Sequence, residues 1–391
     1  MTSRLIVNSI RHTGGSADAV TLASDGTCTA SITNNLSNRN KVINGAMTVS
    51  QRGTSFTASG TASGYGIDRF QENFSMDGGY TLTQSTTSPD GFANSMKIDV
   101  TSADTSLAAG QFVEIKHKIE AQDLQDLAFG TSAAKTVVLS FYVRSNKTGN
   151  YAFAIQQSDN SFKQASFQYA ISSADTWERK TIVIAGDTSG VINNDTGDGF
   201  ILMWALAAGS NLTGGSLRST FTTRVAADQY AGQGVNLLDS TSNEWYITGV
   251  QLEVDHTGSG KPTDFEHRSF GQELALCQRY YYVIADGSEL ADQHIGNGFG
   301  WSSSQVECAI RFPVVMRGNP SLLLSTGTNY YMWRSNGSQI YVTNVALTNA
   351  NPRSASIFAN SSMSVSGAVA NGSYRTQLGN ASAYLHLNAE L

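Results

Sequence analysis

The sequence contains little charge and little proline. Asp, Glu, Lys and Arg make up 14% of its 391 residues, whereas about 25% is usual in soluble domains. It has 5 prolines but 37 glycines. Long surface helices depend on Glu, Lys and Leu, so this composition disfavours them. It favours many short strands joined by Gly, Asn and Asp turns.

Cysteine pairs, basic runs and long apolar runs are also missing. The three cysteines, Cys28, Cys277 and Cys308, include no CxxC pair, which is typical of buried thiols in a chain made in a reducing cytoplasm. The net charge is -6 and no Lys/Arg run occurs, so nucleic-acid binding is not expected. No apolar run approaches a membrane span and the N-terminus has no apolar signal core, so membrane insertion is not expected either.

The usual signatures of nucleotide, zinc and acyl-transfer sites are absent. The GSGK sequence at 258–261 would need Gly in place of Asp255 and Ser or Thr in place of Pro262 to be a phosphate-binding loop. No GxSxG sequence occurs. No two histidines are spaced i, i+4 around a Glu, as in a zinc-binding helix. We therefore expect no cofactor and no metal site.

Paired carboxylates are the remaining route to catalysis, because a glycosidase needs two carboxyls about 5–10 Å apart. The candidate pairs are Glu114 with Glu120 and Asp123 with Asp126. Such pairs are common on the solvated turns and rims of β proteins, so we expect no catalytic residue. A calcium site needs about six to eight oxygen ligands, and the nearest acidic cluster, the DTGD sequence at 195–198, is too sparse.

The middle of the chain, residues 38–268, predicts one large β domain. Apolar residues alternate at Val137, Leu139, Phe141 and Val143, and turn sequences occur at 64–66, 77–79 and 90–91. About eight to ten strands without repeated helices indicate a jelly-roll β-sandwich. Residues 124–129 predict one or two helical turns. The expected strands are 42–49, 80–84, 95–100, 111–119, 136–143, 151–157, 163–169, 178–184, 199–207 and 245–254, with a further strand at 220–225.

A helix is predicted after this domain, over residues 269–282. Ser269 is a suitable N-cap, Glu273 lies near the first turn, and Cys277 and Tyr281 follow at helical spacing. This segment would link the large domain to a smaller one.

Residues 283–391 predict a smaller C-terminal β domain. Asn336 and Gly337, between two aromatic-rich strands, predict a hairpin turn. The expected strands are 306–312, 321–325, 330–333, 339–347, 362–369 and 383–387. The predicted fold class is therefore all-β: short N-terminal strands, a large sandwich, one linking helix and a second β domain.

Residues 1–37 contain two short apolar strips, at 5–10 and 19–22, followed by a turn at 25–26 and by residues 28–32. Each strip is too short to bury a face alone, and an isolated hairpin is only marginally stable in water. The segment is therefore either a flexible terminus or an anchor that is ordered by identical copies or by a partner.

Several segments of the chain resemble tail-fibre and tail-associated proteins of bacteriophages. The segments ITGVQLEV and FEHRSFGQELALCQRYYY resemble a block that ends a jelly-roll, carbohydrate-binding-like domain in those proteins. The first 27 residues resemble a fibre N-terminus that docks on a phage tail. Further resemblance lies in NRNKVINGAMTVSQRG, in GYGIDRFQ and in the closing YLHLNAEL.

The resemblance implies a tail attachment site at the N-terminus, with Leu5, Val7 and Ile10 as its apolar contacts. It implies a homotrimer that docks on a tail adaptor or hub protein. The protein would be made in the host cytoplasm and would belong to the tail of the virion. None of the matching segments is a catalytic signature.

Aromatic residues near loops are the candidates for glycan binding, because sugar C–H faces lie against Trp and Tyr rings. The candidates are Trp301, Tyr330, Tyr331, Trp333 and Tyr341. The alternative is that these aromatics fill a core or a subunit interface, as aromatics usually do.

Together these features predict a non-enzymatic virion protein that attaches to a phage tail and adsorbs to host surface polysaccharide by multivalent binding. Two alternatives remain open. One is a glycan depolymerase on the same scaffold, and the other is a purely structural virion component, such as a head fibre or a collar element.

Overall fold

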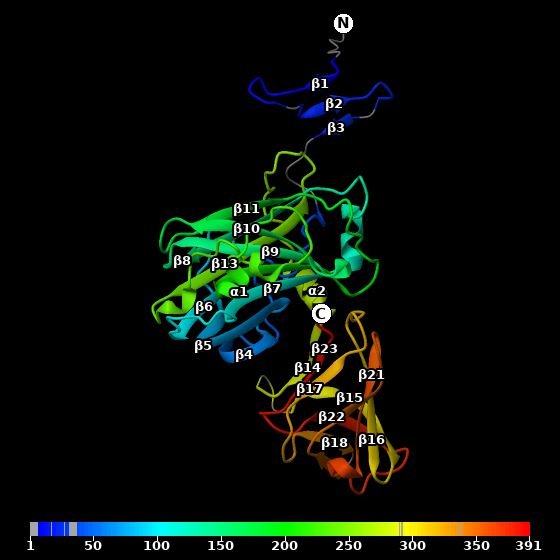
Figure 1. The fold of residues 1–391 in the computed structure, drawn as a ribbon. Helices are drawn as coiled ribbons and strands as arrows, with labels where there is room; N and C mark the ends of the chain where they lie inside the picture. Colours follow the sequence, from blue (N-terminus) through cyan, green and yellow to red (C-terminus); the bar gives the residue numbers. More distant parts are fainter. Residues whose placement is uncertain are drawn as a thin grey trace.

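The computed structural model describes residues 7–16, 18–26, 28–30, 37–288, 290, 292–335 and 338–391. Among the described residues, strands account for 45% and helices for 9%, so the predicted all-β fold class is confirmed. Figure 1 shows a small N-terminal sheet, a large lobe and a C-terminal lobe. The small sheet consists of β1 (Ser9–Ile10), β2 (Val20–Leu22) and β3 (Cys28–Ala30), paired antiparallel in that order.

The large lobe, predicted as a jelly-roll β-sandwich, is formed by a single antiparallel sheet that curls into a near-barrel. The strand order is β10-β9-β12-β7-β5-β6-β13-β8-β11, and β4 pairs with β5. The strands are β4 (Ser55–Tyr65), β5 (Phe70–Ser85), β6 (Ser95–Ser102), β7 (Phe112–Glu120), β8 (Val137–Ser145), β9 (Gly149–Gln157), β10 (Lys163–Ile171), β11 (Glu178–Ile184), β12 (Asp198–Ala208) and β13 (Glu244–Val254).

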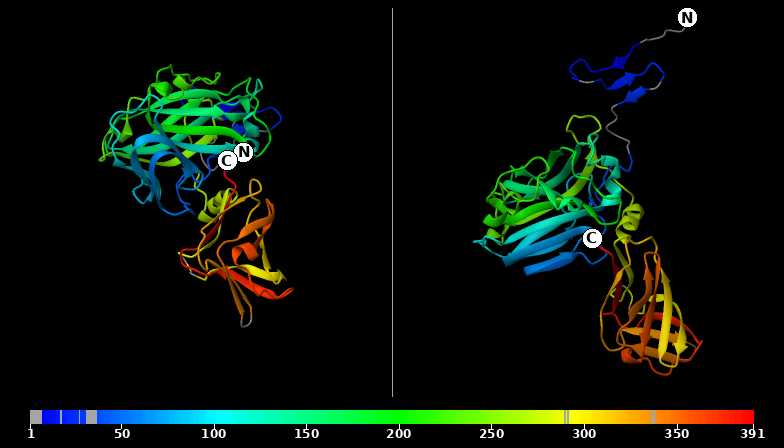
Figure 2. Two further views of the ribbon diagram at one scale, coloured as in Figure 1. Left: turned by 60° about the horizontal axis from the view of Figure 1, so that its bottom comes forward. Right: turned by 45° about the vertical axis from the view of Figure 1, so that its right-hand side comes forward.

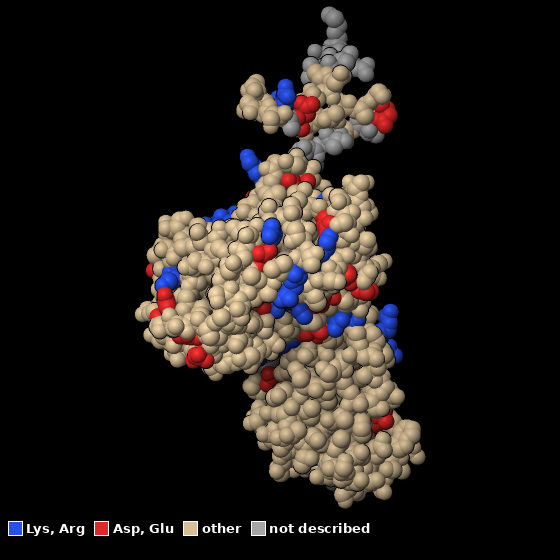
Figure 3. Space-filling model, in the orientation of Figure 1, with Lys and Arg blue, Asp and Glu red and all other residues tan. Residues whose placement is uncertain are grey.

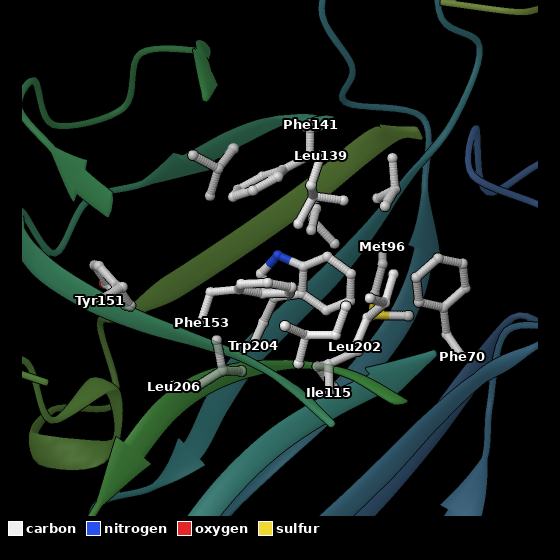
Figure 4. Close-up of a cluster of buried hydrophobic side chains, with 14 of the residues drawn as sticks. Phe70, Met96, Ile115, Leu139, Phe141, Tyr151, Phe153, Leu202, Trp204 and Leu206 are labelled. Carbon is white, nitrogen blue, oxygen red and sulfur yellow. The ribbon is translucent and has the colours of Figure 1, made fainter. Parts of the chain in front are cut away.

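Aromatic and aliphatic side chains fill the inside of this sheet. Trp204 on β12 lies at the centre, with its ring 5.9 Å from the ring of Phe141 and 5.2 Å from the ring of Phe153 (Figure 4). Leu139 and Val143 are fully buried together with Phe141, which confirms the alternation predicted for β8. Each such side chain contributes about 1.5–3 kcal/mol by burial.

The sequence interpretation missed β4 and the first half of β5. It assigned residues 77–79 to a turn, but β5 continues through them. A Cβ atom at Gly78 would lie 2.5 Å from the backbone oxygen of Ser102. This glycine therefore permits the close approach of a neighbouring segment and does not mark a chain reversal.

Three predicted strands are wrong: 42–49, 220–225 and 362–369. Residues 42–49 cross β13 instead, where the Val250 amide donates to the Gly45 carbonyl and the Asn44 side chain donates to the Val49 carbonyl. Residues 220–225 form one isolated bridge, from Thr222 to Gln164. The third segment begins in a 3-10 turn, η5 (Ser361–Met363). In these segments, side-chain hydrogen bonds and turns take the place of the backbone hydrogen bonds between paired strands.

Short helical segments connect several strands. The predicted helical turn at 124–129 is the 3-10 helix η1 (Ala121–Leu127). The other segments are η2 (Ser158–Asn160), α1 (Ser210–Thr213), η3 (Ala226–Asp228) and η4 (Leu237–Asp239).

The linking helix α2 (Phe270–Gln278) begins as predicted. The Ser269 side chain accepts from the Gln272 amide, and the Gln272 side chain accepts from the Ser269 amide, so the two form a capping box. The helix ends four residues before the predicted end at 282. The chain turns there because Tyr281 already belongs to β14 (Tyr281–Asp286), which pairs with β23 (Tyr384–Asn388).

The C-terminal lobe contains two antiparallel sheets that share one hydrophobic core. The smaller sheet has the order β14-β23-β17, with β17 at Ser321–Leu324. The larger sheet has seven strands in the order β19-β18-β22-β15-β16-β21-β20. These are β15 (His294–Ser302), β16 (Gln305–Arg311), β18 (Tyr331–Ser335), β19 (Ser338–Val342), β20 (Ala346–Asn351), β21 (Ser354–Asn360) and β22 (Ser373–Leu378).

The predicted hairpin strands β18 and β19 pair with each other, up to Ser335 opposite Ser338. The turn residues 336 and 337 lie outside the described residues.

Buried ion pairs join the two lobes where the chain ends (Figure 2). Glu390, which follows β23, pairs with Arg69 of the large lobe and, at 2.9 Å, with Arg52. The Arg69 side chain is fully buried. Arg279, which follows α2, binds both carboxylate oxygens of Glu120 on β7 at 2.7 Å. These contacts fix the C-terminal lobe to the large lobe.

We predict that Glu390→Gln lowers the free energy of unfolding by about 3–5 kcal/mol, because it leaves the buried Arg69 without a counter-charge. The matched control is Asp126→Asn, which removes a half-exposed partner of Lys41 and should cost about 1 kcal/mol or less. Urea unfolding measures both. Equal, small effects of the two variants would show that the junction does not depend on this ion pair.

Candidate functional site

The seven-stranded sheet has one face in the core and one face open to solvent. Side chains alternate between the faces of a strand. On β18, Tyr331 and Trp333 are fully buried in the core, and Tyr331 donates to the Tyr384 carbonyl at 2.7 Å. Arg334, the next residue, is exposed. Met332, which lies between the two core rings, is only 5% exposed, so this face is open to solvent around Arg334 and covered near Met332.

Strand β15 shows why this face is aromatic. Its inner positions include Gly298 and Gly300, where a Cβ atom would lie 2.4 Å from the Glu307 carbonyl oxygen and 2.1 Å from the Val369 carbonyl oxygen, respectively. The outer positions hold Phe299 and Trp301. The glycines thus leave space for the core and for a neighbouring loop, while the large rings point outward.

Phe299 and Trp301 form an exposed aromatic pair. Phe299 is 38% exposed and Trp301 is 64% exposed, and their ring centroids are 5.8 Å apart. A β-bulge between Gly300 and Ser302 interrupts the register with β16 next to this pair. Large aromatic side chains usually bury most of their surface, so an open pair of this kind indicates a binding surface.

Two hollows adjoin the aromatic pair. One, of about 740 Å³, lies over β15, β18 and β22. Arg334 faces Arg375 across the strand pair, and Arg375 faces Asn297. The second hollow, of about 360 Å³, contains Trp301 together with Gln305, Glu307, Thr348, Asn349 and Phe358. Ring faces, amides and charged groups therefore line one continuous face, which we call the open sheet face.

Charge is sparse in this lobe. Figure 3 shows few charged side chains on the visible side of the C-terminal lobe, compared with the large lobe and the junction. The open sheet face combines exposed rings, uncharged hydrogen-bonding groups and a small number of charged side chains. Such a surface suits a ligand with alternating apolar and hydroxyl-bearing parts.

The structure divides the predicted glycan-binding residues. Trp301 lies on the open sheet face, as does Tyr341, which is 38% exposed opposite Met332 on β18. Tyr330 is half-buried before β18. A direct ligand contact by Tyr331 or Trp333 is wrong, because both rings are fully buried in the core.

Sequence reasoning missed the other residues of the open sheet face, chiefly Phe299, Phe358, Arg334 and Arg375. The alternation in YMWRS and in GNGFGW was the available signal, since a buried Trp333 requires an exposed Arg334.

The predicted tail-attachment residues are only partly described. Leu5 lies outside the described residues, Val7 is half-buried, and Ile10 in β1 is 53% exposed. Cys277 and Cys308 are buried free thiols as expected, whereas Cys28 is exposed.

The candidate carboxylates have structural partners. Glu114 accepts from Tyr230 and, at 2.5 Å, from Asn73. Glu120 is held by Arg279 and, at 2.5 Å, by Tyr280. Glu114 and Glu120 lie six residues apart on one strand, about 20 Å, which is too far for a glycosidase pair.

A cavity of about 250 Å³ at the lobe junction includes Glu120, Asp123 and His117. Burial lowers the pKa of His117 to about 3, and nearby Arg69 adds to the effect, so the imidazole is neutral. Asp126 pairs with Lys41, and Asp198 with Lys118 at 3.2 Å. Within the described ranges no cluster of three or more His, Cys, Asp or Glu could hold a metal ion.

No helix in the described part of the chain is long and apolar enough to cross a membrane.

The sequence matches no family model and no curated protein. Some solved structures show a distant likeness. The enzymatically active domain of tailspike protein 4 of bacteriophage CBA120 is 10% identical over 55% of this chain and 21% of that chain, with a TM-score of 0.29. A putative sugar-binding protein from Bacteroides thetaiotaomicron is 13% identical over 56% of this chain and 100% of that chain, with a TM-score of 0.28.

A family 11 carbohydrate-binding module from Clostridium thermocellum is 12% identical over 54% of this chain and 99% of that chain, with a TM-score of 0.26. Likenesses at this level assign no function.

We predict that the two tryptophans of the C-terminal lobe respond oppositely to truncation. Trp333→Ala should lower the free energy of unfolding by about 3–5 kcal/mol, because it empties a core position. Trp301→Ala should change it by no more than about 0.5 kcal/mol. Thermal or urea unfolding of both variants tests this, and a strongly destabilised Trp301→Ala protein would place that ring in a core.

Proposed function

We propose that the protein is a non-catalytic glycan-binding component of a phage tail, and that the open sheet face binds host surface polysaccharide. The observation that carries the proposal is the exposed pair Phe299 and Trp301, flanked by two hollows lined with polar groups. Sugar rings present C–H faces to such rings, and their hydroxyls bond to amides and carboxylates. Asn297, Gln305 and Glu307 provide these partners.

The rigidity of the face favours binding. Its residues lie on neighbouring strands of one sheet, so their spacing is set by the backbone hydrogen bonds and little backbone entropy is lost when a ligand binds. A single sugar contact of this kind remains weak. Several linked copies raise the total strength by about 10²–10⁴ without any new contact.

The N-terminal sheet supports assembly into an oligomer. It has three strands of two or three residues, with Ile10 53% exposed and Leu22 40% exposed. So small a sheet has no core of its own and gains stability by packing on other chains. With the resemblance to tail-fibre termini, this supports a homotrimer docked on a tail adaptor.

Two alternative functions are a glycan depolymerase and a purely structural virion component. A depolymerase needs two convergent carboxyls, whereas the candidate acids Glu114 and Glu120 are bound to structural partners. Shortened polysaccharide chains after incubation with the protein would favour the depolymerase. A purely structural role does not use the exposed aromatic pair.

We predict that an excess of the soluble protein blocks adsorption of the virus to its host, and that the double variant Phe299→Ala, Trp301→Ala does not. The variant loses ring faces that contribute about 1–3 kcal/mol each to stacking contacts. Phe162→Ala, at a 46% exposed aromatic of the large lobe, is the matched control and should block as well as the wild type.

A double variant that still blocks would exclude the open sheet face as the binding site. A wild-type protein that fails to block would favour the purely structural role.

The assembly is tested separately by the mass of the protein in solution. Light scattering should give three times the chain mass of 41.7 kDa, and removal of residues 1–30 should lower the mass or weaken the assembly. A clean monomer for the full chain would contradict the trimer.

A further inference from the structure

We infer that the ligand of the open sheet face is an acidic glycan, and that Arg334 and Arg375 bind its carboxylate. This inference rests on the proposed function and specifies its class of ligand. Nothing in it requires a particular host or sugar sequence.

The two arginines lie directly opposite each other on β18 and β22. Like charges in this position destabilise a sheet by repulsion. Both side chains are exposed, and no Asp or Glu within the described ranges forms an ion pair with either of them. By contrast, the fully buried Arg69 and the partly buried Arg279 at the lobe junction are each paired with a carboxylate.

A planar guanidinium can donate two parallel hydrogen bonds to a carboxylate. Two of them in one hollow form an anion site, and Asn297, opposite Arg375, adds an amide that can bond to a hydroxyl. An anionic ligand would also relieve the repulsion between the two arginines, so the pair is stabilised when the ligand binds.

The aromatic pair lies at a suitable distance from the arginine pair. Phe299 is two residues from Asn297 on β15, and Ser373 is two residues from Arg375 on β22. Two residues of a strand span about 7 Å, which one or two sugar units can bridge. A uronic acid could therefore place its carboxylate on the arginines while the adjoining ring lies on Phe299 and Trp301.

A second arginine pair extends the positive character of the face. Arg311 at the end of β16 and Arg353 beside β21 line a further hollow of about 470 Å³ with Asn349 and Asn351. Glu307 is the one acid that lines the described hollows of this face. A chain with repeated carboxylates would meet both arginine pairs.

The experiment uses the full-length protein on a glycan array that carries uronic-acid oligosaccharides, their methyl esters and sulfated oligosaccharides. We expect the free acids to bind at least about tenfold more tightly than the esters, because charge-assisted hydrogen bonds are lost on esterification. The preference should weaken as salt rises. Equal binding of acids and sulfated sugars would leave the anion site in place and show that it does not select carboxylates.

Two variants assign the site. Arg334→Gln with Arg375→Gln should remove the preference for acids. The control variant, Arg179→Gln with Arg224→Gln, removes the same two charges at exposed positions of the large lobe. It should leave the preference for acids unchanged. Equal binding of acids and esters, or a preference that survives in the first double variant, would overturn the inference while leaving glycan binding intact. A protein that binds no glycan of any class on the array would overturn the proposed function as well.

Discussion

The C-terminal lobe depends on the two-residue alternation of its strands. On β15 the inner positions are glycine, because the core and a neighbouring loop approach within contact distance of the backbone. This arrangement lets Trp333 fill the interior while Phe299 and Trp301 remain outside. The filled core and the aromatic open face are therefore two consequences of one backbone geometry, and a side chain at Gly298 would disturb both.

The junction between the lobes supports this face from a distance. Glu390 holds the end of the chain against the large lobe by pairing with the buried Arg69. Glu120 holds the end of α2 there by pairing with the partly buried Arg279. A buried ion pair adds little net stability over an apolar replacement, so we interpret these pairs as defining one arrangement of the two lobes. A fixed arrangement of the two lobes favours multivalent binding, because several copies can bind one surface only if their open sheet faces are held in compatible orientations.

The sequence predicted the fold class and most strands, since alternating segments such as β8 and β16 carry a clear period. It did not predict β4 or the continuation of β5, because glycines that serve close approach look the same as glycines in turns. Of the residues predicted to bind glycan, Trp301 and Tyr341 lie exposed on the open sheet face. The sequence interpretation misplaced Trp333, because an aromatic residue next to a turn is assigned to a face only once the partner strands are known.

The central claim is that the open sheet face contacts host polysaccharide. Hydroxyl-radical footprinting of the full chain, with and without that polysaccharide, tests it most directly because it reads the exposure of individual side chains. The account predicts that oxidation of Phe299 and Trp301 falls strongly on binding, while that of Phe162 on the large lobe is unchanged. Protection on the large lobe, with Phe299 and Trp301 oxidised as before, would contradict it.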